Sequence, residues 1–182
     1  SIVPKMHYSL ASPVEGSGSR ADEAEYIIIA PDDPDFIAWA DSLKLFRNQQ
    51  GISTRVVTTT EIGGNTFSAI EQFVDDAYYN WSTPPSAVLL LADYGNSGNT
   101  ITSSPEKAHP YSGTYVSDND FADVDGDDLP DVVFSRITAQ NADQLALMVG
   151  KVLDYERNPP TNPDFYDHPV TAMGWQTERW FQ

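Results

Sequence analysis

Residues 123–131, DVDGDDLPD, place five carboxylates within nine positions. The side chains at alternate positions of such a turn point toward a common centre, and the backbone carbonyl of Leu129 can add a further oxygen. Calcium binds six to eight hard oxygen ligands at about 2.3–2.6 Å in a flexible cage. The spacing therefore predicts a calcium site formed by Asp125, Asp127, Asp131 and the Leu129 carbonyl.

The alternative for the same residues is a solvated acidic turn with no ion. Carboxylates held about 4–6 Å apart repel one another and raise one another's pKa. The chain already carries a formal net charge of -17, so a further concentration of negative charge needs a compensating partner. For this reason, and because Gly126 allows a tight turn, we favour the cation site.

A further carboxylate, Asp93, ends another apolar run of the sequence. If that run and the one after the acidic turn are neighbouring parallel strands, Asp93 and the turn share the carboxyl edge of the sheet, where ligand sites of α/β proteins form. We therefore predict Asp93, in preference to Asp123, as the remaining metal ligand. The alternative is that Asp93 only initiates a turn before Tyr94 and Gly95.

The elements that would position these residues alternate along the chain. Short β-rich apolar runs at 26–30, 53–60, 86–95 and 131–137 predict strands. Amphipathic stretches at 35–50, 66–81 and 141–157 predict helices, the first with Asp35 as N-cap and Gly51 as stop, the last opened by Asn141. Residues 94–122 predict a long loop. This order indicates an α/β fold with a parallel sheet of about four strands and helices on both faces.

The composition of the remaining segments suggests four regions. Residues 1–25 lack periodicity and predict a flexible, irregular N-terminal lead-in, followed by the α/β sub-domain at 26–157. The proline-rich stretch beginning NPPTNP predicts a linker at 158–169. Residues 170–182, containing VTAMGWQ, are expected to be the first strand of a truncated second sub-domain.

The charge and the residue types exclude several functions. With 10 basic and 27 acidic residues, the surface would repel nucleic acid and anionic membranes, and no apolar stretch is long enough for a membrane span. The chain contains no cysteine, so it can form neither a disulfide nor a cysteine nucleophile by itself.

The order of the motifs resembles the gingipain-type cysteine peptidases. These motifs are a Ser-Asp pair at 117–118, the D-G-D-x-x-P-[DE] loop at 125–131, a strand that carries Arg136 near its end, and a helix ending in Tyr-Glu at 155–156. The resemblance covers about residues 26–182. One departure is Asp128, which stands where related loops often have glycine to allow a left-handed backbone.

The resemblance implies a caspase-like catalytic unit of two sub-domains, of which this chain would be the first plus the opening strand of the second. It implies a structural Ca²⁺ held by Asp93, Asp125, Asp127, Asp131 and the Leu129 carbonyl, whereas Asp123 has no regular family counterpart. Glu178 matches the position of the acid that orients the catalytic histidine. The catalytic histidine and cysteine would lie on the second sub-domain, the necessary partner, and none of His7, His109 and His168 is expected to be catalytic. The parent would be a bacterial endopeptidase, secreted or at the cell surface, that acts on polypeptides.

Two other functions remain as alternatives. Asp32, Asp33 and Asp93 after two strands could form the acidic pocket of a receiver-like phospho-acceptor domain, although that reading needs a lysine after a fifth strand, and none appears. A non-enzymatic calcium-binding module would need repeated acidic loops, and the sequence has one. Arg136 is expected to be a structural partner of a nearby aspartate.

Overall fold

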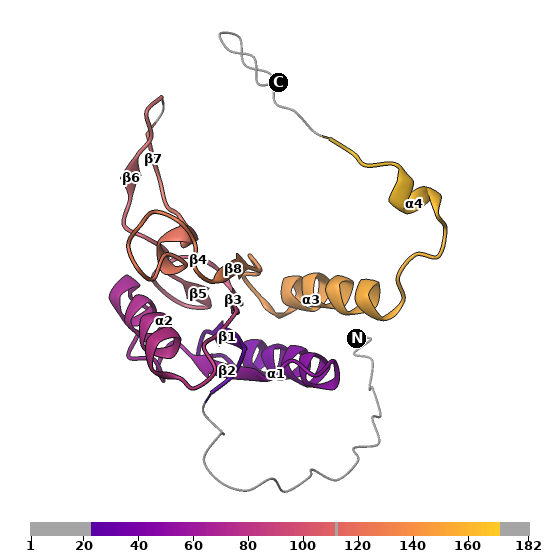
Figure 1. The fold of residues 1–182 in the computed structure, drawn as a ribbon, viewed down its shortest axis with the longest axis horizontal. Helices are drawn as coiled ribbons and strands as arrows, with labels where there is room; N and C mark the ends of the chain where they lie inside the picture. The colour runs from indigo at the N-terminus through magenta and orange to yellow at the C-terminus, as the bar shows by residue number, and fades with distance from the viewer. Residues whose placement is uncertain (1–22, 112, 172–182) are drawn as a thin grey trace, which may run out of the picture.

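The computed structural model describes residues 23–111 and 113–171, and its centre is a parallel sheet of four strands. The strand order is β2-β1-β3-β8 (Figure 1). The strands are β1 (Tyr26–Ala30), β2 (Thr54–Thr58), β3 (Ala87–Leu90) and β8 (Val133–Arg136), and each neighbouring pair is parallel. The predicted α/β class and the parallel sheet are confirmed.

Helices cover both faces of this sheet. Helices α1 (Pro34–Gln49) and α3 (Ala142–Arg157) contact each other on one face, and α2 (Phe67–Asn80) lies on the other (Figure 1). A short 3₁₀ helix, η1 (Asp118–Phe121), lies with α2, since the rings of Phe67 and Phe121 stack at 5.0 Å. The helices at 66–81 and 141–157 were thus predicted to within one residue at each end.

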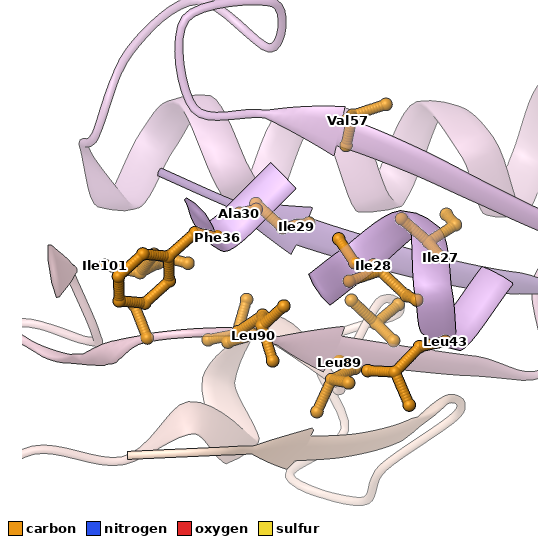
Figure 2. Packing of buried hydrophobic residues seen from close by; sticks show 14 of the residues in the cluster. Ile27, Ile28, Ile29, Ala30, Phe36, Leu43, Val57, Leu89, Leu90 and Ile101 are labelled. Carbon is orange, nitrogen blue, oxygen red and sulfur yellow. The ribbon is translucent and has the colours of Figure 1, made fainter. Parts of the chain in front are cut away.

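The core forms around β1, whose residues 27–30 are completely buried (Figure 2). A strand covered on both faces reads as a continuous apolar run, which is why YIIIA shows no alternation. Each helix contributes buried residues at helical spacing, so one stripe of each faces the sheet. These are Phe36, Ala40, Leu43 and Phe46 in α1, Ile70, Val74 and Ala77 in α2, and Leu145, Val149 and Leu153 in α3.

The predicted N-cap of the first helix was wrong. Asp33, not Asp35, caps α1: its Oδ1 accepts the amides of Asp35 (2.9 Å) and Phe36 (3.3 Å). The cause is Pro34, which has no amide hydrogen and disfavours the helical region for the residue before it, so Pro34 takes the first helical position and Asp33 stays extended. Asn141 caps α3 as predicted, accepting the Gln144 amide at 3.0 Å.

The strand expected at 86–95 is shorter than predicted, and the expected loop at 94–122 contains short strands. β3 ends at Leu90, and β4 (Asp93–Tyr94) pairs with β5 (Thr100–Ile101) in a separate sheet. β6 (Lys107–Ala108) and β7 (Thr114–Tyr115) form an antiparallel hairpin. Gly95 permits the close approach of β5, because a Cβ there would lie 2.7 Å from Thr100 Oγ1.

The predicted boundaries of the four regions at 1–25, 26–157, 158–169 and 170–182 remain predictions. Ala24 is buried and the Glu25 carbonyl accepts the Ser86 amide at 2.8 Å, so the chain is anchored just before β1. Residues 158–163 contain no helix or strand, and a four-residue helix, α4 (Asp164–Asp167), follows. Most of the lead-in (1–22) and of the strand predicted at 170–182 lies outside the described residues. No helix within the described ranges is long and apolar enough to cross a membrane.

Candidate metal site and the polar network at the sheet edge

The acidic loop, residues 123–131, connects η1 to β8 and is closed at its base. The Ala122 carbonyl accepts the amides of Asp131 (2.8 Å) and Val132 (3.3 Å). Ala122 is itself buried, so the base of the loop is attached to the core. The loop therefore begins and ends at one fixed point beside the sheet.

Two carboxylates organise the inside of the acidic loop. Asp123 Oδ1 accepts the amides of Gly126 (2.9 Å) and Asp127 (3.1 Å), and its Oδ2 accepts that of Asp128 (2.9 Å). Asp131 Oδ2 accepts the Val124 amide at 2.9 Å. Gly126 (φ 80°) and Asp128 (φ 68°) adopt left-handed conformations, which curl the backbone around these carboxylates.

Three carboxylates of the acidic loop are close enough to share one cation. Asp123, Asp125 and Asp131 each present an oxygen, and the three oxygens lie within 4.8 Å of one another. Two oxygens bound to one Ca²⁺ at about 2.4 Å can be at most about 4.8 Å apart, so this donor set fits the ion. Desolvation, followed by the neighbouring charges of Asp127 and Asp131, raises the pKa of Asp125. A bound cation would relieve the repulsion between these charges.

The structure brings together only part of the predicted ligand set. Asp125 and Asp131 lie in the close group. Asp123, to which Asp93 was preferred as the remaining ligand, lies there with them. Asp127 is not in that group, and its Oδ1 accepts the Leu129 amide at 2.9 Å. The roles of Asp127 and of the Leu129 carbonyl remain predictions.

Asp93 does not join the close group either. Its Oδ2 accepts Gln140 Nε2 at 2.6 Å and its Oδ1 accepts the Tyr94 amide at 2.8 Å. The bond from Gln140, followed by that from the Tyr94 amide, lowers the pKa of Asp93. Asp93 as a metal ligand therefore remains a prediction. The turn-initiating alternative gains no support, because Asp93 and Tyr94 form strand β4 and the bond goes to the adjacent amide.

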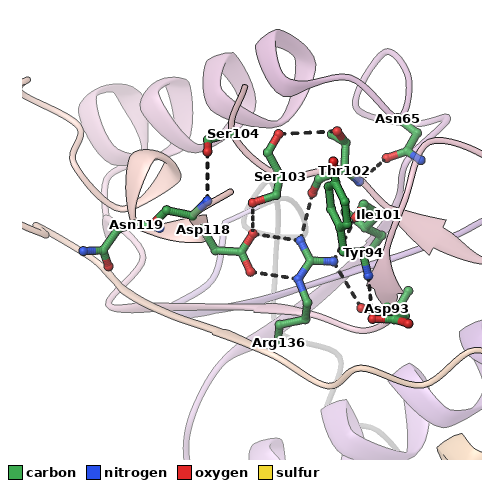
Figure 3. A network of polar contacts seen from close by, with 12 residues as sticks. Asn65, Asp93, Tyr94, Ile101, Thr102, Ser103, Ser104, Asp118, Asn119 and Arg136 are labelled. Atoms are coloured by element: carbon green, nitrogen blue, oxygen red, sulfur yellow. Dashed lines mark hydrogen bonds and ion pairs between the residues drawn. The ribbon is translucent and has the colours of Figure 1, made fainter. Parts of the chain in front are cut away.

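Arg136, at the end of β8, is the centre of a polar network (Figure 3). Its Nε and Nη2 donate to the two carboxylate oxygens of Asp118, both at 2.8 Å. The same guanidinium donates to three backbone carbonyls, those of Ala92 (3.2 Å), Ile101 (2.9 Å) and Thr102 (2.8 Å). With five donors bonded and a side chain 9% exposed, Arg136 is a structural partner of an aspartate, as predicted.

Two of the three residues proposed for a phospho-acceptor pocket, Asp33 and Asp93, form other hydrogen bonds. Asp33 caps α1, and its Oδ2 accepts Asn99 Nδ2 at 3.0 Å, while Asp93 is bonded to Gln140. Within the described ranges, Asp32, Asp33 and Asp93 do not form a group that could hold a metal ion. Glu178 lies outside the described residues, so its predicted role is untested.

The four-stranded parallel sheet with helices on both faces defines an α/β domain of the caspase-like type, which solved gingipain structures share. The sequence model of Peptidase family C25 matches residues 19–177. The chain therefore belongs to Peptidase family C25.

Known relatives agree with this assignment. The chain is 27% identical over 157 residues to Gingipain R2 of Porphyromonas gingivalis, a match that covers 82% of this chain and 18% of that protein. Among solved structures, the complex of Porphyromonas gingivalis RgpB pro- and mature domains aligns with 25% identity and a TM-score of 0.58 over 74% of this chain and 29% of that chain. The crystal structure of the Arg specific cysteine proteinase gingipain R aligns with 25% identity and a TM-score of 0.56, over 77% of this chain and 30% of that chain. The chain thus spans less than a third of each of these relatives.

Proposed function

We propose that this chain is the N-terminal, non-nucleophilic sub-domain of a gingipain-like cysteine endopeptidase. The observation that carries the proposal is the family match over residues 19–177 in a sequence without cysteine. A cysteine peptidase attacks the peptide carbonyl with a thiolate, so the nucleophile must come from polypeptide outside this chain. The sub-domain alone is then inactive.

The partner would be the remaining catalytic sub-domain, which carries the cysteine and the histidine. Glu178 would accept a hydrogen bond from that histidine and stabilise its protonated form, as the acid of a catalytic triad does. Polypeptides are the proposed substrates, and the parent is proposed to be secreted or exposed at the bacterial cell surface. Both proposals rest on the similarity to Gingipain R2.

The acidic loop is proposed to hold a structural Ca²⁺. Asp123, Asp125 and Asp131 supply three oxygens at compatible separations, and Asp127, the Leu129 carbonyl and Asp93 are the other predicted donors. When bound, the ion supplies positive charge that offsets the repulsion among these carboxylates. Binding to the folded state alone stabilises it by RT ln(1 + [Ca²⁺]/Kd).

The inactivity is tested by incubating the purified chain with chromogenic peptide substrates, with and without Ca²⁺. We expect no hydrolysis above the blank. Turnover that co-elutes with the chain in gel filtration would contradict the proposed role.

The calcium site is tested by calorimetric titration of the chain with CaCl₂. Asp125→Asn and Asp131→Asn are each expected to weaken binding by about tenfold or more, because each removes a charged oxygen ligand. Asp143→Asn is the matched control, since it removes the same charge from the first turn of α3. Unchanged affinity in both loop variants would refute the ligand assignment.

A further inference from the structure

The 3₁₀ helix η1 is attached to the acidic loop at its C-terminal end. The Asn119 carbonyl accepts the amides of Ala122 (3.0 Å) and Asp123 (3.2 Å), and the Ala122 carbonyl accepts that of Asp131 (2.8 Å). Two of the three clustered carboxylates, Asp123 and Asp131, therefore sit on residues bonded directly to η1 or to its C-cap Ala122. A change in the geometry of the loop base must move η1 or break these bonds.

At its N-terminal end, η1 is attached to the edge segment, which we define as residues 91–104. Asp118 accepts two bonds from Arg136 and a third from Ser103 Oγ at 2.7 Å. The Ser117 amide also donates to Ser104 Oγ at 2.9 Å. Figure 3 shows Asp118 between Arg136 and Ser103.

Arg136 completes the connection because it reaches three carbonyls of the edge segment as well as Asp118. A planar guanidinium bonded at all five positions fixes direction as well as distance, which a lysine ammonium with three donors cannot reproduce. Thr102 and Ser103 are themselves buried, so water cannot easily replace the hydrogen bonds that their polar groups form with the protein. The acidic loop, η1 and the edge segment are thus joined by one continuous set of bonds.

We propose that Arg136 and Asp118 are positioning residues that couple the acidic loop to the edge segment, so that Ca²⁺ binding in the loop orders residues 101–104. This inference rests on the calcium site of the proposed function. Neither residue needs to touch the ion, because coupling between two sites is reciprocal. If the ion orders the edge segment through the Arg136–Asp118 pair, losing this pair lowers the affinity for the ion by the factor by which the ion favours the ordered segment.

The experiment combines hydrogen exchange of peptides covering residues 91–104 with calcium titration, on the whole chain. In the wild type, Ca²⁺ is expected to slow exchange at 101–104 by about fivefold or more. Asp118→Asn and Arg136→Lys are expected to reduce this slowing to less than about twofold and to raise the Kd for Ca²⁺ by about fivefold. Arg47→Lys is the matched control, because Arg47 forms a bidentate pair with Glu156, between α1 and α3, and should change neither quantity.

The outcomes separate this inference from the function on which it rests. Failure of the wild type to bind Ca²⁺ refutes the calcium site itself. The coupling is overturned, and the calcium site left standing, if the wild type binds Ca²⁺ with unchanged exchange at 101–104. The same holds if Asp118→Asn and Arg136→Lys keep both the wild-type exchange and the wild-type affinity. If Asp118→Asn or Arg136→Lys loses cooperative unfolding, Ser103→Ala is tested in its place, because it removes one bond to Asp118 and keeps the ion pair. Wild-type exchange and wild-type affinity in Ser103→Ala would also overturn the proposal.

Discussion

Asp128 holds a left-handed backbone conformation, and no other non-glycine residue in the described part of the chain has a positive φ. An L-residue in this region costs about 1 kcal/mol relative to glycine, although aspartate tolerates it better than most. We expect Asp128→Gly to raise the free energy of unfolding by about 0.5–1 kcal/mol. Urea denaturation in the presence of a calcium chelator measures the change.

The control for this prediction separates the backbone from the charge. Asp128→Asn removes the same negative charge from the acidic loop but keeps a side chain that tolerates the left-handed region. A gain as large in Asp128→Asn as in Asp128→Gly would assign the effect to charge repulsion instead of backbone strain.

Asp125 should respond to substitution with opposite signs in the presence and absence of calcium. Its pKa is raised in the folded state, so without a cation the ionised group opposes folding, and stability increases as the pH falls through the raised value. At neutral pH in chelator, Asp125→Asn should therefore raise the melting temperature, and in excess CaCl₂ it should lower it. A scan of melting temperature in both buffers checks this; the same sign in both would contradict the cation site.

The candidate site could be predicted from the sequence only in part. Alternate acidic positions identified Asp125 and Asp131 correctly as neighbours, because that information is local to the turn. Asp93 was preferred to Asp123 because of its expected place at the edge of the sheet. That expectation locates a side chain only to within about the spacing of neighbouring strands. The bond from Gln140, which lies 47 positions away in the sequence, could not be anticipated.

At the level of the elements, the caps of the helices make a direct prediction. Asp33→Ala should lower the free energy of unfolding by about 1–2 kcal/mol, because it removes the acceptor for two amides of α1. Asp35→Ala removes only an acidic side chain from the first turn and should cost about 0.5 kcal/mol. Urea unfolding of both variants measures the difference, and equal losses would mean that Asp33 does not act as the cap.

The elements themselves were predictable where periodicity and burial agree. Strand β1 and helices α2 and α3 were predicted correctly because the spacing of their apolar residues reflects burial in, or against a face of, the same central sheet. The strand at β3 was predicted too long because Leu91 and Ala92 are also buried, although β3 ends at Leu90. The two-residue strands β4 to β7 depend on contacts such as that of Gly95 with Thr100, which no local pattern encodes.

At the level of the whole molecule, β8 lies at an edge of the described sheet and presents Val133 at 69% exposure. An apolar edge strand can pair with another chain, and at a net charge of -17 electrostatic repulsion opposes such pairing. Raising the salt concentration screens that repulsion, with a Debye length that falls from about 10 Å at 0.1 M to about 3 Å at 1 M. We therefore expect self-association, measured by light scattering, to increase with salt.

Val133→Lys should suppress this association, since it places a charge on the edge strand. Leu147→Lys, which makes the same change at an exposed position of α3, should leave most of it. Equal suppression by both would show that general hydrophobicity, instead of the strand edge, drives the association.

The exposed edge also has a practical consequence for anyone preparing the chain. Ammonium sulfate fractionation and hydrophobic interaction chromatography both remove the electrostatic protection of β8 and should lead to precipitated material. At low ionic strength the repulsion between the negatively charged molecules is not screened, so they stay apart. Anion exchange, loaded at low ionic strength, is therefore the better purification step.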